Sequence, residues 1–137
     1  MPILADTSGL LALADADDPA HRSVRDYLAR GSEAVLVPVT LLAEIDHMVA
    51  TRLGVRTELA LLRSLVESTF RLEGFSTGDL ERSLELIEQY ADSNIGLVDA
   101  SIVAIAERLR ITRILTLDAR HFRMFRPRHC ESFELVP

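Results

Sequence analysis

Short, continuously apolar runs alternate along this chain with longer amphipathic segments. The expected strands lie at 3–5, 34–37, 70–75, 114–117 and 133–136. The expected helices lie at 10–14, 19–29, 40–53, 57–68, 76–90 and 97–109. Most of these strands are apolar throughout, which is typical of a mostly parallel sheet covered by helices on both faces. The pattern therefore predicts one α/β domain over residues 1–137, with a central sheet of about four to five strands.

Capping residues indicate where several helices begin and end. Asp18 and Pro19 suit an N-cap and a first helical position, and Gly31 follows the end of the same helix. Gly54 marks the end of the helix at 40–53, and the polar residues at 76–79 are typical of a helix start.

Two of the expected strands run directly into an aspartate. Asp6 follows the strand at 3–5, and Asp118 follows the strand at 114–117. In a parallel sheet both carboxylates then lie at the carboxyl edge, where ligands bind. Each aspartate could equally cap the helix that follows it, so the pattern leaves a functional site and a pair of helix caps as alternatives.

Asp99 lies on the apolar face of the expected helix at 97–109, because the residues three, four and seven positions further on are all apolar. A carboxylate on such a face is costly unless a partner neutralises it. Capping is the alternative role, but Ser93 and Asn94 already offer caps nearby. The position therefore favours Asp99 as a site residue.

The expected helix at 40–53 carries two further acids beside its apolar stripe. Glu44 projects to one flank of the stripe and Asp46 to the other, so periodicity cannot choose between them. His47 projects to the opposite side, where we expect solvent. Carboxylates that are brought together without Lys repel one another unless a cation neutralises them. An all-oxygen site favours Mg²⁺ or Mn²⁺ over zinc, and Mg²⁺ held by carboxylates is typical of phosphoryl chemistry.

Composition excludes several other kinds of site. All 15 basic residues are Arg, so there is no P-loop lysine, Schiff-base lysine or receiver-type phosphoacceptor site. The net charge of -6 argues mildly against a nucleic-acid partner. Cys130 is the single cysteine, which fits a reducing cytoplasm, and a zinc site with His121 and His129 has poor ligand number and spacing. No apolar run has membrane-spanning length, and the first residues do not form a signal peptide.

Four motifs together resemble those of PIN-domain nucleases. They are Asp6-Thr7-Ser8 after the first strand, Leu-Leu-Ala-Glu at 41–44, Gly-Leu-Val-Asp-Ala at 96–100 and Leu-Thr-Leu-Asp-Ala-Arg-His-Phe at 115–122. Their order and spacing cover nearly the whole chain, and in particular they resemble VapC-type toxins of VapBC type II toxin–antitoxin systems. The resemblance implies a PIN-like three-layer α/β/α sandwich.

The same resemblance implies roles for the acids. Asp6, Glu44, Asp99 and Asp118 would form the catalytic acidic pocket. Asp6 and Asp99 would be the most direct ligands of Mg²⁺, with Mn²⁺ as the other possible ion. Asp118 would complete the metal site, and Glu44 would bind the metal or order its waters. In a second tier, Thr7 or Ser8 could contribute a hydroxyl, and Asp92 matches an acid often seen before this helix.

The implied reaction is metal-dependent hydrolysis of an RNA phosphodiester bond by an activated water, with tRNA or rRNA as the expected substrate. The implied partner is a cognate VapB-type antitoxin that blocks the site. The resemblance also implies a cytoplasmic homodimer with no membrane association.

Basic residues are concentrated around the last acid of the motif set. Between positions 108 and 129, seven Arg accompany a single acid, Asp118. Arg suits bidentate phosphate contacts, and the candidates for binding RNA are Arg120, Arg123 and Arg126. Because Lys is absent, any contacts with RNA phosphates must come from Arg, from backbone amides or from the metal.

For other residues of this stretch, the sequence leaves two interpretations open. Phe122 and Phe125 either stack on bases or belong to the core. Arg108 and Arg110 either hold phosphates or complement the C-terminus of the helix at 97–109.

The sequence gives weaker support to three alternative functions. A phosphatase of the haloacid dehalogenase type needs a second acid two residues after the first, where this chain has Ser8. A non-catalytic PIN-fold binding module is disfavoured because all four acids are present. A DNA nuclease of the same fold would usually need additional segments to grip a duplex.

Overall fold

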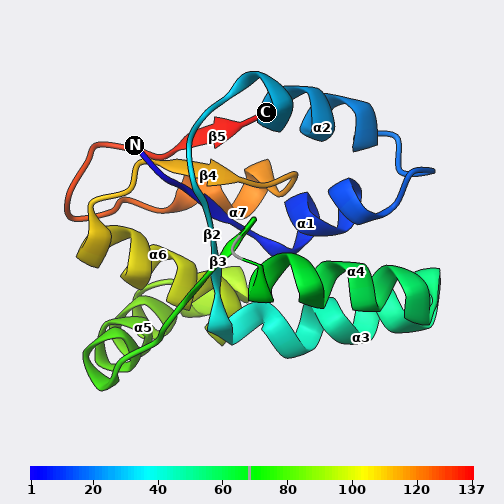
Figure 1. The fold of residues 1–137 in the computed structure, drawn as a ribbon. Helices are drawn as coiled ribbons and strands as arrows, with labels where there is room; N and C mark the ends of the chain where they lie inside the picture. Colours follow the sequence, from blue (N-terminus) through cyan, green and yellow to red (C-terminus); the bar gives the residue numbers. More distant parts are fainter. Residues whose placement is uncertain (68) are drawn as a thin grey trace.

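In the computed structural model, which describes residues 1–67 and 69–137, five parallel strands form a sheet in the order β3-β2-β1-β4-β5. The strands are β1 (Ile3–Ala5), β2 (Val35–Pro38), β3 (Arg71–Glu73), β4 (Arg113–Leu115) and β5 (Glu134–Val136). From β1 the chain moves to β2 and β3 on one side, and later to β4 and β5 on the other side (Figure 1). The direction therefore reverses between β1 and β4, and ligands bind at such a point, beyond the carboxyl ends of the strands.

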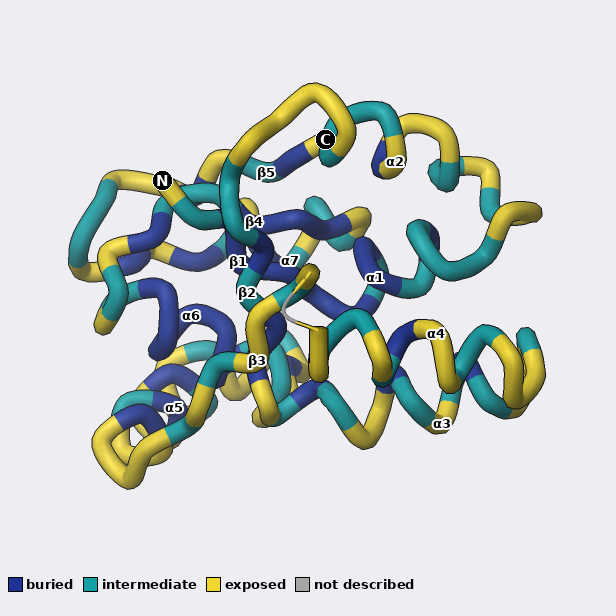
Figure 2. The backbone as a smooth tube through the Cα atoms, viewed as in Figure 1, coloured by how far each residue is buried: buried dark blue, intermediate teal, exposed yellow. Residues whose placement is uncertain are grey.

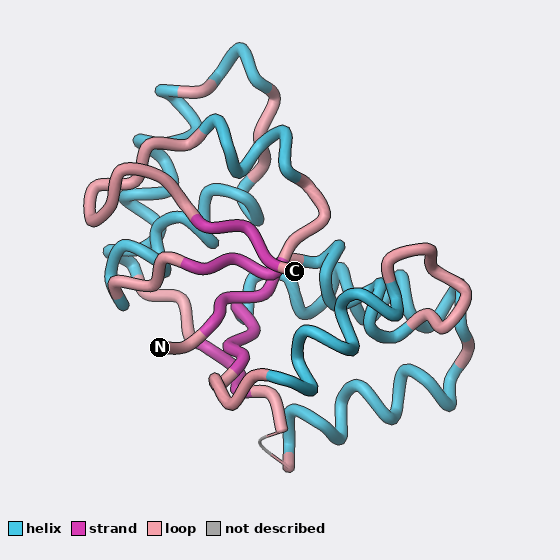
Figure 3. The backbone as a smooth tube through the Cα atoms, turned by 90° about the horizontal axis from the view of Figure 1, so that it is seen from above, coloured by secondary structure: helices cyan, strands magenta, loops and turns pink. Residues whose placement is uncertain are grey.

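Helices lie on both sides of the strands (Figure 3). They are α1 (Thr7–Ala14), α2 (His21–Arg30), α3 (Leu42–Leu53), α4 (Val55–Val66), α5 (Thr77–Gln89), α6 (Leu97–Leu109) and α7 (Ala119–Met124), with short 3-10 turns η1 (Val39–Leu41) and η2 (Ala91–Ser93). The longest helices pair as an α3–α4 hairpin and as α5 against α6 (Figure 1). The predicted three-layer arrangement around a parallel sheet is confirmed. No helix in the described ranges is both long and apolar enough to cross a membrane.

Buried residues are concentrated in the central strands and in α6 (Figure 2). All three residues of β1 are at most 1% exposed, and α6 buries an unbroken run from Ala100 to Ala106. Gly9 allows α1 to approach β4 closely, because a Cβ at this position would lie 2.7 Å from the carbonyl oxygen of Leu115. This contact sets the first residues of α1 beside the end of β4.

The end of β4 differs from the prediction. The strand stops at Leu115 rather than at Leu117, and the next residue turns its hydroxyl toward Asp6. Asp118 therefore follows a two-residue connection rather than the strand itself. It begins α7, a helix of six residues that the hydrophobic pattern does not predict.

Other helix boundaries also differ from the prediction, and helix α1 begins at Thr7 rather than at residue 10. Helix α2 begins at His21, because Asp18 Oδ1 accepts the Ala20 amide at 2.8 Å and forms a turn before the helix instead of capping it. Helix α4 spans Val55–Val66 rather than 57–68, and residue 68 of that prediction lies outside the described residues.

Candidate active site

The four predicted acids line one pocket of about 490 Å³ at the carboxyl edge of the sheet. Each comes from a different part of the chain: Asp6 follows β1, Glu44 lies in α3, Asp99 lies in α6 and Asp118 precedes α7. Thr7 and Ser8 also line the pocket, and none of the described lining residues is basic. The geometry therefore brings together all of the predicted first-tier residues and two of the second tier.

Asp6 is held by hydroxyl groups rather than acting as a helix cap. Its side chain makes no capping bond to α1. Instead, Asp6 Oδ2 accepts hydrogen bonds from Thr116 Oγ1 at 2.8 Å and from Ser8 Oγ at 3.0 Å. Burial raises the pKa of Asp6 above its usual range, and the hydrogen bonds from Thr116 and Ser8 partly oppose this effect.

Glu44 is the acid of α3 that reaches the pocket. Thr7 Oγ1 donates a hydrogen bond to Glu44 Oε2 at 2.9 Å. Asp46 lies on the other flank of α3, where its carboxylate raises the pKa of Glu58 of α4. Periodicity left open whether Glu44 or Asp46 reaches the pocket. The structure places Glu44 there, held by Thr7, a residue remote in sequence.

Asp99 lies in the first turn of α6 without capping it. The N-cap is Gly96, so the expectation that Ser93 or Asn94 caps this helix is wrong. The Asp99 side chain is only 20% exposed. Burial raises its pKa to about 6, with a further contribution from the negative charge of Asp6. A proton or a cation at this position would relieve the repulsion.

Asp118 both caps a helix and contributes to the pocket. Its Oδ1 accepts the amide of His121 at 3.2 Å, which caps α7. Its Oδ2 lies 2.9 Å from His121 Nδ1, and the same ring nitrogen lies 3.4 Å from Asp99 Oδ2. Asp118 therefore caps α7 and also lines the pocket.

His121 lies beside two of the pocket acids, and the sequence analysis did not identify it as their neighbour. One ligand atom each from Asp99, Asp118 and His121 lie within 4.8 Å of one another. The zinc interpretation grouped His121 with His129, but His129 Nε2 contacts the Ile111 carbonyl oxygen, beyond the other end of α6. The available signal was the spacing of three residues between Asp118 and His121, which places two side chains on one face of a helix.

The remaining candidates lie outside the pocket. Asp92 is exposed in η2 and is not among the described lining residues. Arg120 and Arg123 are exposed on α7. The Arg126 guanidinium instead donates to the carbonyl oxygens of Arg123 at 2.7 Å and Phe125 at 3.0 Å.

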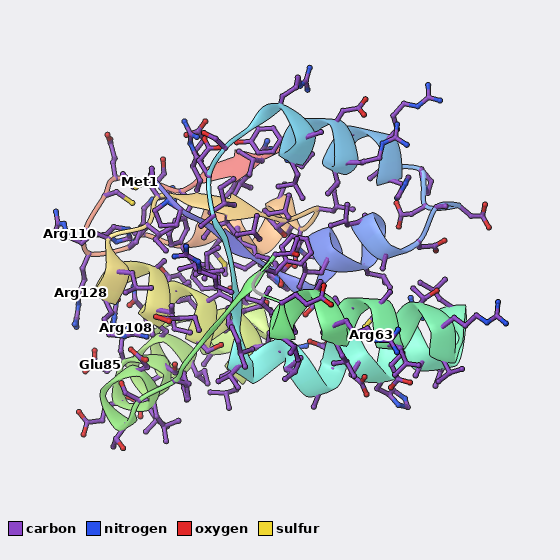
Figure 4. The ribbon with its side chains drawn as sticks, viewed as in Figure 1. Met1, Arg63, Glu85, Arg108, Arg110 and Arg128 are labelled. Atoms are coloured by element: carbon purple, nitrogen blue, oxygen red, sulfur yellow. The ribbon has the colours of Figure 1, made fainter. Side chains whose placement is uncertain are left out.

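The interpretation in which Phe122 and Phe125 stack on bases is wrong, because both rings are fully buried. They pack edge to face with centroids 5.7 Å apart. Arg108, Arg110 and Arg128 lie near the far end of α6 (Figure 4), where Arg108 pairs with Asp79 at 3.0 Å and Arg128 pairs with Glu85 at 2.8 Å.

The donor set fits a divalent cation. Carboxylates that converge in a partly buried pocket without a basic lining residue require neutralisation, and the raised pKa values of Asp6 and Asp99 report that requirement. Carboxylate oxygens are the ligands that hard divalent ions prefer.

Comparison with known proteins places the chain in a family. The family model of the PIN domain matches residues 3–126 of this chain. Ribonuclease VapC26 of Mycobacterium tuberculosis is 38% identical over 135 residues, which cover 98% of this chain and 100% of that protein.

Solved structures show the same fold. The crystal structure of M. tuberculosis VapC20, a sarcin-ricin loop cleaving toxin, has a TM-score of 0.79 at 23% identity, covering 86% of this chain and 91% of that one. A toxin–antitoxin complex from Klebsiella pneumoniae has a TM-score of 0.71 at 23% identity and covers 90% and 92%. VapBC2 of Rickettsia felis, bound to a promoter DNA fragment, has a TM-score of 0.72 at 16% identity and covers 100% of both chains. The chain belongs to the PIN-domain family, among the VapC ribonucleases.

Proposed function

We propose that this chain is the toxin of a type II toxin–antitoxin pair and that it hydrolyses RNA phosphodiester bonds at the acidic pocket. The observation that carries the proposal is the convergence of Asp6, Glu44, Asp99 and Asp118 on one pocket without a basic lining residue. The 38% identical relative is a ribonuclease, which supports RNA as the substrate class.

Mg²⁺ or Mn²⁺ is the proposed cofactor, and when bound it supplies positive charge to the phosphate and lowers the pKa of a water. Asp6 and Asp99 are the proposed direct ligands, Asp118 completes the set, and Glu44 binds the cation or orders its water. Ser8 and Thr116 hold the Asp6 carboxylate in one orientation, and Thr7 does the same for Glu44.

RNA is proposed to cross the pocket along α7. Arg120 and Arg123 are exposed on the helix that begins directly after Asp118, so their guanidinium groups can reach phosphates next to the one that is cut. Arg126 has a structural role in this proposal, because backbone carbonyl oxygens already occupy its guanidinium. Asp92 is given no role in catalysis.

A VapB-type antitoxin is the proposed partner, in keeping with the toxin–antitoxin complexes among the solved structures. A homodimer is proposed through the apolar side chains of the α3–α4 hairpin, where Val55 is 62% and Leu59 is 41% exposed. The proposed substrates are tRNA or rRNA, and since these are abundant in the cytoplasm, we place the protein there.

The deciding experiment is induced expression of the wild type and of Asp99→Asn, with cellular RNA mapped for new 5′ ends. We expect growth arrest and discrete cuts with the wild type alone. Cuts that persist in Asp99→Asn would contradict the metal-dependent mechanism. The absence of cuts with either protein would favour a non-catalytic binding module, and cuts confined to DNA would favour a DNA nuclease.

A further inference from the structure

We propose that His121 is a nitrogen ligand of the cation site and that it makes this site prefer a divalent transition-metal ion, such as Mn²⁺, to Mg²⁺. The inference rests on the proposed function, since it concerns the same cation. It changes the expected chemistry of the site, because four carboxylates alone would form an all-oxygen site.

The distances around the imidazole are those of adjacent ligands on one ion. His121 Nδ1 lies 2.9 Å from Asp118 Oδ2 and 3.4 Å from Asp99 Oδ2. In an octahedral site with metal–ligand distances of about 2.1 Å, neighbouring ligand atoms are separated by about 3 Å and opposite ones by about 4.2 Å. The three atoms all lie within 4.8 Å of one another. They can therefore surround one cation with small side-chain movements.

The local backbone places the nitrogen of His121 beside Asp99 and Asp118, at the rim of the pocket rather than among its lining residues. Asp118 precedes α7, and His121 follows it by three positions, so the two side chains lie on the same face of the first turn. The capping bond from the His121 amide occupies Asp118 Oδ1, while Oδ2 contacts the His121 ring nitrogen at 2.9 Å, and a cation would replace this second contact. When the ring carries its proton on Nε2, the lone pair of Nδ1 faces the space between the two carboxylates.

The mixed donor set gives a reason for metal selectivity. Mg²⁺ prefers oxygen ligands and loses its waters reluctantly, whereas imidazole nitrogen suits divalent ions of the first transition row. Removal of the nitrogen should therefore weaken the binding of Mn²⁺ much more than the binding of Mg²⁺.

Electron paramagnetic resonance with Mn²⁺ as the probe tests the inference on the intact protein. We expect one bound Mn²⁺ in the wild type, with nitrogen hyperfine coupling in the spin-echo spectrum. The coupling should vanish in His121→Gln and persist in His47→Ala, because His47 is exposed on α3 and does not belong to the ligand group of Asp99, Asp118 and His121. Calorimetric titrations with each metal should show that the preference for Mn²⁺ over Mg²⁺ falls about tenfold or more in His121→Gln and is unchanged in His47→Ala.

The outcomes separate this inference from the proposed function. A wild-type protein that binds one Mn²⁺ without nitrogen coupling overturns the role of His121 and leaves the carboxylate site intact. Coupling that persists in His121→Gln also overturns it. A wild-type protein that binds no divalent cation contradicts both proposals. The wild-type spectrum is decisive even if a variant fails to fold.

Discussion

Thr7 Oγ1 donates a hydrogen bond to Glu44 Oε2 at 2.9 Å and so joins the start of α1 to α3 across 37 positions of sequence. Thr7 is buried whereas Glu44 is exposed, so an anchored hydroxyl restrains a carboxylate that would otherwise move freely in solvent. The orientation of Glu44 in the pocket thus depends on a residue of another helix.

We expect Thr7→Val to weaken cation binding about tenfold, because groups that orient metal ligands typically contribute an effect of that size. Thr7→Ser keeps the hydroxyl and should bind nearly as the wild type does. Titration with Mn²⁺ followed by magnetic resonance measures both affinities. Equal affinities in Thr7→Val and the wild type would show that Glu44 needs no such restraint.

Asp99→Asn should abolish RNA cleavage and yet stabilise the cation-free protein at pH 8. The pKa of Asp99 is about 6 in the folded protein, against a model-peptide value of 3.8. Between these values the folded state retains a proton that the unfolded state has lost, so the free energy of unfolding falls as the pH rises. Asn removes this penalty, which amounts to at most about 3 kcal/mol.

Urea denaturation of both proteins at pH 8 and pH 4, with a chelator present, measures this effect. The advantage of Asp99→Asn should disappear at pH 4, where the carboxyl group of the wild type is protonated. Asp17→Asn is the matched control, because Asp17 is an exposed acid between α1 and α2. If Asp99→Asn proves less stable than the wild type at pH 8, Asp99 is not a repelled carboxylate.

Thr116→Val should shift the acidic limb of the activity profile to higher pH. The Thr116 hydroxyl donates to Asp6 Oδ2 at 2.8 Å, and a hydrogen bond to the ionised form lowers a pKa. Its loss should raise the pKa of Asp6 further, so that a higher pH is needed to ionise the carboxylate. The rate of RNA cleavage between pH 5 and pH 9 measures the shift. Thr116→Ser should leave the profile in place, and an unshifted profile in Thr116→Val would refute the prediction.

Gly9→Ala should destabilise the protein by about 1–3 kcal/mol, because the new methyl group would meet the backbone carbonyl of Leu115 and push α1 away from β4. Gly78→Ala is the control, since the nearest atom to its Cβ would be Ser76 Oγ at 3.7 Å. It should be neutral or stabilise α5 by up to about 1 kcal/mol. Chemical denaturation compares the two, and equal effects would argue against the close approach of α1 and β4.

Arg120→Ala and Arg123→Ala, each made in the Asp99→Asn background, should weaken RNA binding. Each should also reduce the number of counterions released on binding by about one, as measured by the slope of log affinity against log salt concentration. Arg126→Ala should instead lower thermal stability, because its guanidinium donates to carbonyl oxygens at the end of α7. Arg30→Ala, on the exposed end of α2, serves as the control. Salt slopes that match between Arg120→Ala and Arg30→Ala would exclude α7 as an RNA contact.

The hydrophobic pattern was sufficient to predict β1, β2 and β4, because strands buried on both faces are largely apolar. It gave weaker support to the edge strands, since β3 and β5 both contain exposed charged residues. It also placed Asp6 and Asp118 at one edge, since the carboxyl ends of parallel strands meet there. It could not choose Glu44 over Asp46, because the choice depends on Thr7, a contact that is remote in sequence.

The hydrophobic pattern missed His121 for a different reason. Helix α7 has only six residues, which is too short for a helical period to stand out, so the shared face of Asp118 and His121 was not recognised. The same short helix concealed the burial of Phe122, whose ring packs on Phe125. Short helices are formed by tertiary contacts more than by their own sequence.

The order of elements along the chain has a consequence during protein synthesis. Asp6 follows the first strand to leave the ribosome, whereas Asp118 follows the fourth, and the pocket needs both. At about 5–20 residues per second, translation separates the two by roughly 6–20 s. Until Asp118 has been added, the nascent chain lacks at least one carboxylate of the proposed cation site, so on the proposed function it cannot cut the RNA of the ribosome that is making it.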